Sequence, residues 1–149
     1  MPNPGFRPRA SLFGSPVHAM LVHFPIACFV GALFSDLAYV SAPHPQWANF
    51  SEWLLAFGEL FGVIAALFGA IDLFGSPRGS RPGIAYLHFL GAATVLVLGL
   101  FNNLVHARDG WSGVAGTGLL LSVLTVLALL VTGLLGHRLA FIYQERARP

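Results

Sequence analysis

Long hydrophobic blocks along this chain are separated by shorter polar segments. Four apolar stretches lie at about 17–40, 53–74, 84–106 and 114–137. Each has the roughly 20 apolar residues that an α-helix needs to cross about 30 Å of hydrocarbon. Backbone groups in lipid must be satisfied within the spanning structure, and this favours helices over strands. The pattern therefore predicts four transmembrane helices.

The polar segments between these stretches are short and rich in turn-forming residues. They read SAPHPQWANFSE, GSPRGSRPG and ARDGWSG, with Pro and Gly at the expected breaks. Short connections place consecutive helices antiparallel. We expect an all-α integral membrane protein with an up-down bundle at 17–143, preceded by a segment at 1–16 and followed by a tail at 144–149.

The charged residues predict how the bundle is oriented. Only 9% of residues are charged, the net charge is +2, and the eight basic residues are all arginine. One side of the predicted membrane receives seven of them: Arg7, Arg9, Arg78, Arg81, Arg138, Arg146 and Arg148. The positive-inside rule then puts both termini in the cytoplasm of a bacterium, with the bundle in its inner membrane. Three tryptophans map to the outer side: Trp47, Trp53 and Trp111.

Composition also limits the partners. Membrane lipid is the expected surrounding, and no basic stripe exists that would neutralise nucleic-acid phosphates. We also find no nucleophile–base arrangement, phosphate loop or CxxC motif in the sequence, so we expect no catalytic activity. The single Cys28 lies within an apolar stretch.

Small residues at helical spacing predict which faces point inward, because small side chains mark contacts between membrane helices. In the first stretch they are Ala19, His23, Ala27, Gly31 and Ser35, and in the second they are Gly58, Gly62, Ala65, Gly69 and Asp72. At 100° per residue, His18 lies ~140° from His23 around a regular helix. We therefore expect His23 to point inward and His18 to lie at the rim, with a kink at Pro25 beside His23.

Ionisable groups gather at one depth on the cytoplasmic side. They are His23, His88 and Asp72, with His18 and His137 at the rim. Such groups are costly in a membrane and are usually functional. The outer side carries Asp36, His44 and His106, for which we expect no comparable cluster, and Glu59 is expected close to the outer surface.

Several motifs resemble one known family. HAMLVHFPIA, SDLAY, GAIDLF, AYLHFLGAA and TGLLGHRLAFIY are similar to the small bacterial four-helix membrane proteins called domain of unknown function 2231. The resemblance covers most of 15–143 and implies the four-helix fold and a membrane location. Departures from the usual pattern of the family fall at Ser15, Ala19, His137 and Tyr143.

One functional interpretation of the ionisable layer is a b-type haem. Two imidazoles from facing helices can ligate haem iron inside a bundle. His23 and His88 are the expected pair, with His18 and His137 nearby and Arg81 or Arg138 meeting the propionates. The protein would then transfer electrons.

Three alternatives stay open. A small metal site would use His23, His88 and Asp72, since imidazole and carboxylate suit zinc, iron or copper. A proton or small-solute path would use Asp72 and the histidines. A cofactor-free accessory subunit of a respiratory or photosynthetic complex, or a homodimer, would use these groups structurally, with Asp72 paired to Arg78 or Arg81.

Overall fold

The computed structural model describes residues 9–13, 15–77, 80–108 and 113–147. Two short strands, β1 (Ser11–Leu12) and β2 (Ser15–Pro16), form an antiparallel hairpin before the first helix. The helical elements are α1 (Val17–Leu21), α2 (His23–Ser41), α3 (Pro45–Gly75), α4 (Gly83–His106), the π-helical turn η2 (Val114–Gly118) and α5 (Leu119–Ala147).

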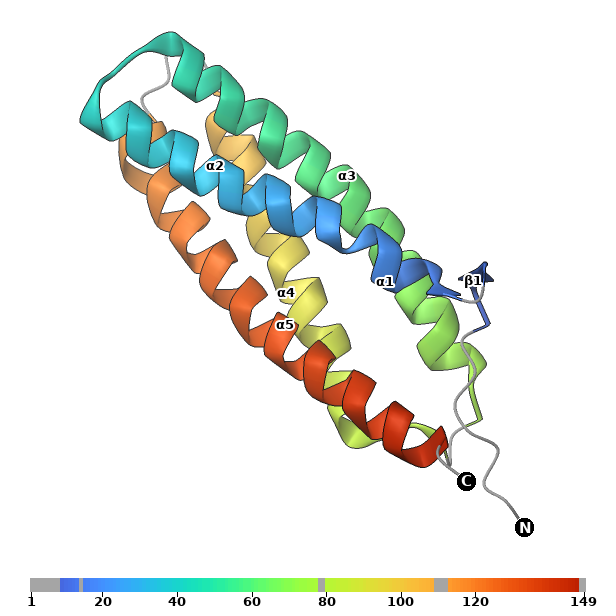
Figure 1. The fold of residues 1–149 in the computed structure, drawn as a ribbon. Coiled ribbons are helices and arrows are strands. Elements are labelled where there is room, and N and C mark those ends of the chain that lie inside the picture. Colours follow the sequence, from blue (N-terminus) through green and yellow to red (C-terminus); the bar gives the residue numbers. More distant parts are fainter. Residues whose placement is uncertain (1–8, 14, 78–79, 109–112, 148–149) are drawn as a thin grey trace.

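These elements make an antiparallel bundle of four helices, each long and apolar enough to span a membrane (Figure 1). The predicted fold class is therefore confirmed. We call the end where α1 begins and α5 ends the proximal end, and the end where α2 leads into α3 the distal end. Which end faces the cytoplasm stays a prediction. Four of the residues on which this prediction rests lie outside the described residues: Arg7, Arg78, Trp111 and Arg148.

The first span is broken close to its beginning. Helix α1 ends at Leu21, Val22 forms a turn, and α2 starts at His23. Pro25 has no N–H to donate to the carbonyl of Leu21, so the regular helical bonding cannot continue through this point. The kink expected at Pro25 is thus present as a break, and it separates His18 from His23.

Helix α3 begins at Pro45, well before the expected start near 53. The side chain of His44 accepts a hydrogen bond from the backbone N–H of Gln46, and proline suits the first position of a helix. The helix has 31 residues, which puts Glu59 near its middle. Glu59 therefore lies about four turns from the first residue of α3, farther along the helix than the expected start near 53 would place it.

A ring of apolar contacts around Phe29 forms the core. Phe29 packs with Leu55, Val95 and Leu129, and its ring lies against Gly58 of α3 and Gly99 of α4. A Cβ at Gly99 would come within 2.9 Å of this ring, so glycine is needed there for the helices to approach. The Phe29 side chain of α2 thus fills the space that Gly58 and Gly99 leave on the neighbouring helices.

This packing decides which faces are inward. The α3 stripe is confirmed at its buried members, Gly58, Gly62, Ala65 and Asp72. The stripe predicted for the first span is wrong at Ala19, His23 and Ala27, which are exposed, and is confirmed at Ser35. Helix α2 instead buries Pro25, Phe29, Ala32, Ser35 and Asp36. The physical reason is the Phe29 ring, which must face the glycines opposite it.

A buried carboxylate ties all four spans together near the distal end. Asp36 of α2 is fully buried. Its Oδ1 accepts from the hydroxyl of Ser51 in α3 (2.5 Å) and from Nε2 of His106 in α4 (3.0 Å). Its Oδ2 accepts from the hydroxyl of Ser122 in α5 (2.5 Å). The amide of Asn102 lies 2.7 Å from that same hydroxyl. We call Asp36, Ser51, Asn102, His106 and Ser122 the distal network.

The expectation that the outer side has no comparable cluster is therefore wrong. Asp36 and His106 are two of the residues predicted on the outer side. Together with Ser51, Asn102 and Ser122 they form the distal network. A buried carboxyl is tolerated when its lone pairs are satisfied by donors, and the distal network supplies them from three helices.

We predict that Asp36→Ala destabilises the bundle by about 2–5 kcal/mol, because it leaves buried donors of three helices without their acceptor. Thermal unfolding in detergent would measure this loss. Thr94→Ala is the control, since the Thr94 hydroxyl is exposed and, among the described residues, bonds only to the carbonyl of Leu90 in its own helix. That change should stay within about 0.5 kcal/mol. Equal stability of both variants would contradict a tying role for Asp36.

Candidate functional site

A cavity of about 420 Å³ opens between α1, α2, α3, α4 and α5 toward the proximal end. Its wall includes all five residues of the predicted ionisable layer: His18, His23, Asp72, His88 and His137. The rest of the wall is mostly apolar and small, with alanines and glycines from the same helices. The helices thus leave a chamber at the depth where the sequence places its ionisable groups.

Two histidines face each other across this chamber. The ring centroids of His18 and His88 are 5.8 Å apart, and their planes are nearly perpendicular at 85°. His18 comes from α1 and His88 from the first turns of α4. Their rings are the only pair of imidazoles in contact among the described ring contacts.

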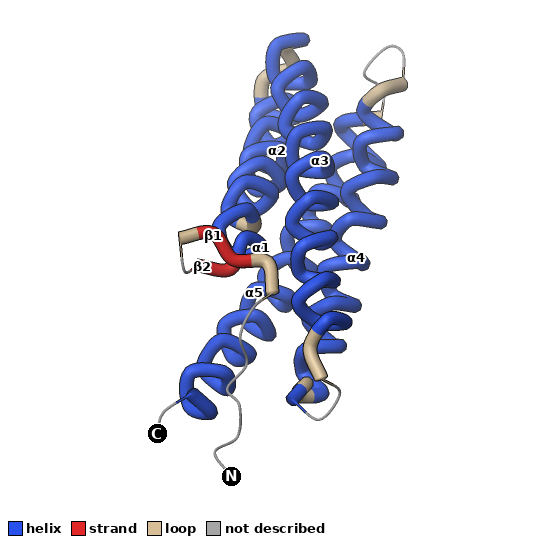
Figure 2. The backbone as a smooth tube through the Cα atoms, turned by 90° about the vertical axis from the view of Figure 1, so that its right-hand side faces the viewer, coloured by secondary structure: helices blue, strands red, loops and turns tan. Residues whose placement is uncertain are grey.

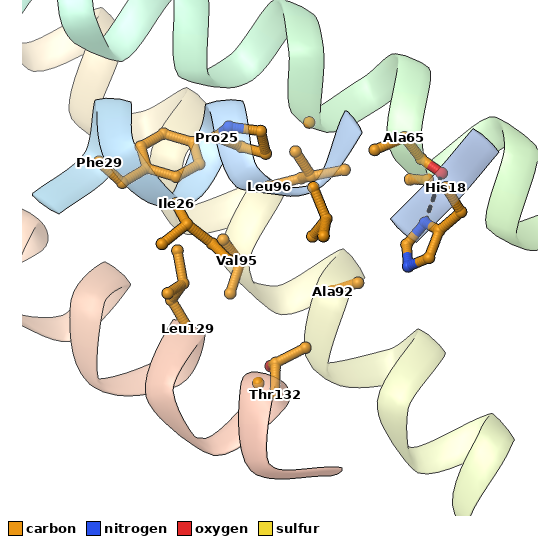
Figure 3. A pocket seen from close by; sticks show the side chains of 14 residues that line it. His18, Pro25, Ile26, Phe29, Ala65, Ala92, Val95, Leu96, Leu129 and Thr132 are labelled. Atoms are coloured by element: carbon orange, nitrogen blue, oxygen red, sulfur yellow. Dashed lines mark hydrogen bonds between the residues drawn. The ribbon is translucent and has the colours of Figure 1, made fainter. Parts of the chain in front are cut away.

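Backbone carbonyls of neighbouring helices hold both rings in place. Nδ1–H of His18 donates to the carbonyl oxygen of Ala65 in α3 (2.8 Å; Figure 3). Nδ1–H of His88 donates to the carbonyl oxygen of Thr132 in α5 (3.0 Å). A carbonyl can only accept, so Nδ1 carries the proton in each ring. In a neutral imidazole this leaves the lone pair on Nε2, the tautomer that metal-ligating histidines commonly have.

Glycines make the room for these rings. A Cβ at Gly69 of α3 would lie 3.0 Å from Nδ1 of His18, and a Cβ at Gly136 of α5 would lie 2.8 Å from Cε1 of His88. Each imidazole therefore donates to a carbonyl on one helix turn and packs against a glycine on the next. The rings are fixed on two sides before any ligand is considered.

The expected pairing of His23 with His88 is corrected by this geometry. His88 meets the ring of His18, while His23 is exposed and its Nδ1 lies 3.4 Å from the carbonyl of Met20. The angle between His18 and His23 was derived for an unbroken helix. The turn at Val22 breaks that relation, and α1 carries His18 inward against α3.

The remaining members of the layer have other contacts. His137 is exposed and packs edge-on against Phe141 at 4.8 Å. Oδ1 of the buried Asp72 accepts from the backbone N–H groups of Arg9 (2.7 Å) and Ala10 (2.9 Å). The Asp72 carboxylate therefore anchors the chain that leads into the β1–β2 hairpin beside α1 (Figure 2).

Arg81 does not pair with Asp72, and Arg78 lies outside the described residues. The Arg81 guanidinium donates to the carbonyl oxygens of Ser76 and Phe74 at the end of α3. This satisfies carbonyls that a helix C-terminus leaves without partners. Arg81 thus holds the α3–α4 connection together, and the expected ion pair with Asp72 is replaced by a cap.

A second, smaller cavity of about 80 Å³ also has His18 in its wall (Figure 3). Apolar side chains of α2, α4 and α5 line it, including Ile26, Val95 and Leu129. The Phe29 ring is also part of this wall, and His18 and Thr132 are its polar members. Over the described ranges, no three His, Cys, Asp or Glu side chains are grouped closely enough to hold a metal ion.

Some important contacts gave little signal in the sequence. The carbonyls of Ala65 and Thr132 position the two imidazoles, yet any residue provides a carbonyl. The members of the distal network are distant along the chain, and only their similar predicted depth would have linked them. Asn102 and Ser122 are ordinary polar residues until the helices bring them to Asp36.

The chain is a helical membrane protein with four candidate spans. Its polar groups gather in the distal network near one end of the bundle and in the histidine chamber near the other. The sequence pattern of the family described as "Predicted membrane protein (DUF2231)" matches residues 14–148. The chain therefore belongs to that family, and the resemblance noted from its motifs is confirmed. No solved structure matches the chain.

We predict that Gly136→Ala displaces the His88 ring and costs about 1–3 kcal/mol of stability, as overpacking generally does. Gly133→Ala is the matched control, one turn away in α5, because no described atom beyond the adjoining backbone of its own helix lies within 4 Å of a Cβ built there. Thermal unfolding of both variants in the same detergent would give the comparison. A Gly136→Ala variant as stable as Gly133→Ala would show that His88 is not held as described.

Proposed function

We propose that this protein binds a b-type haem between His18 and His88 and transfers electrons within the membrane. The observation that carries the proposal is the facing pair of imidazoles, each with Nδ1–H bonded to a backbone carbonyl. When bound, the haem would supply a one-electron carrier. The proposal keeps the cofactor expected from the sequence and replaces His23 by His18 as the partner of His88.

The spacing of the rings fits a shared metal. An ion at about 2 Å from one nitrogen of each imidazole would hold the ring centroids roughly 6 Å apart. The observed separation is 5.8 Å. The mainly apolar chamber of about 420 Å³ beside the rings suits a macrocycle with an apolar surface. Two ligands also suffice for haem, whereas a small metal site would need a third.

The chain's own groups would divide the remaining work. The carbonyls of Ala65 and Thr132 fix the ring orientation and increase the basicity of Nε2. The mostly apolar wall would contact the face of the macrocycle. Arg138, exposed beside His137, is the arginine we assign to the propionates, since Arg81 is engaged with α3 carbonyls.

The proposal includes a location and partners. We place the protein in a bacterial inner membrane with the histidine chamber on the cytoplasmic side, following the arginine distribution. An electron carrier needs a donor and an acceptor, so we expect other subunits of a membrane complex, or a second copy of this chain, beside the bundle.

The test is the visible spectrum of the protein purified in detergent from haem-replete cells. We expect a reduced-minus-oxidised b-type spectrum that is lost in His18→Ala and in His88→Ala. His23→Ala is the matched control, because His23 lines the same chamber but is exposed. It should keep the spectrum of the wild type.

Two outcomes would reject the proposal. A colourless wild-type protein would leave the cofactor-free accessory subunit as the better reading, above all if a larger complex co-purifies with it. Loss of the spectrum in His23→Ala together with its retention in His18→Ala would restore the pairing expected from a regular helix and overturn the one proposed here.

A further inference from the structure

Glu59 carries a carboxyl group in the central part of a helix long and apolar enough to span a membrane. It is close to the middle of the 31-residue helix α3, with spanning helix on both sides of it. An ionised group at the bilayer centre is costly, and such groups mark sites of ion or proton binding. Neither the histidine chamber nor the distal network includes Glu59.

The carboxyl is tucked into a niche between helices. Its Oε2 is buried and has no hydrogen-bond partner among the described residues. The niche exists because residue 99 of α4 is glycine: a Cβ there would lie 2.8 Å from Oε2 and 2.9 Å from the Phe29 ring. Neither Gly99 nor the Phe29 ring, which meet the carboxyl at this point, has a side chain that donates a hydrogen bond to it.

The titratable groups on the packed helices lie elsewhere. On α2 the nearest is Cys28, whose Cβ packs against Gly58, and Asp36 lies about two turns further along. On α4 they are Tyr86, His88 and His106, toward the two ends of the helix. No cation therefore faces the Glu59 carboxyl from the described part of either helix.

We propose that Glu59 is a proton-binding site at the middle of the membrane. The carboxyl carries a proton on oxygen in the lipid-embedded protein, and the O–H bond breaks and re-forms as the proton exchanges with water. The neutral form removes the cost of an unpaired charge in an apolar niche. The site is separate from the proposed haem chamber, so it stands whether or not a haem is bound.

Infrared difference spectra of the protein in phospholipid vesicles test this site. We expect the C=O band of a neutral carboxyl at neutral pH, its loss in Glu59→Gln, and its disappearance as the buffer is made alkaline. Glu52→Gln is the matched control, because Glu52 lies two turns away in the same helix. It should leave the band unchanged.

A second measurement needs no variant. Dicyclohexylcarbodiimide, an apolar reagent, reacts with protonated carboxyls in lipid: the carboxyl oxygen bonds to the central carbon, its proton moves to nitrogen, and the acyl group then shifts to nitrogen. Peptide mass mapping should find this adduct on Glu59 and not on Glu52. A wild-type protein without the Glu59 band, a band that persists in strong alkali, or an adduct confined to Glu52 would overturn the proposal.

Discussion

The structure depends on how one buried carboxylate is satisfied. Asp36 is fully buried near the distal end, and its two oxygens accept hydrogen bonds from Ser51, His106 and Ser122. Lipid gives membrane helices little hydrophobic reason to associate, so such polar contacts carry much of the specificity of the arrangement. Because each donor comes from a different helix, the network sets the relative rotation and depth of all four spans at once.

The proximal end is organised in the opposite way. There the helices do not close on a shared polar group but surround a chamber, and His18, Asp72 and His88 of its wall bond to backbone groups of other segments. His18 and His88 are each fixed by a carbonyl of another helix and packed against a glycine. Pro25 contributes from a distance, because the break at Val22 gives α1 its own direction. One small bundle thus combines a hydrogen-bonded network at its distal end with a cavity at its proximal end.

Much of this architecture could be predicted from the sequence, and the exceptions have physical causes. Hydropathy and the glycine stripe of α3 predicted the spans and the inward face of that helix, since both are local properties. His23 was expected opposite His88 in place of His18 because a regular helix was assumed across Val22. Asp36 was missed because its partners are far apart in sequence, and Glu59 was misplaced because the cap at His44 extends α3 by about two turns.

The facing of His18 and His88 is the central claim, and it can be tested without any cofactor. With Cys28→Ala as background, His18→Cys and His88→Cys would be combined and treated with dibromobimane, which fluoresces when it bridges two nearby thiols. The pair His23→Cys with His88→Cys serves as the comparison. The account predicts a strong bridge at positions 18 and 88 and a weak one at positions 23 and 88. The reverse result would contradict it.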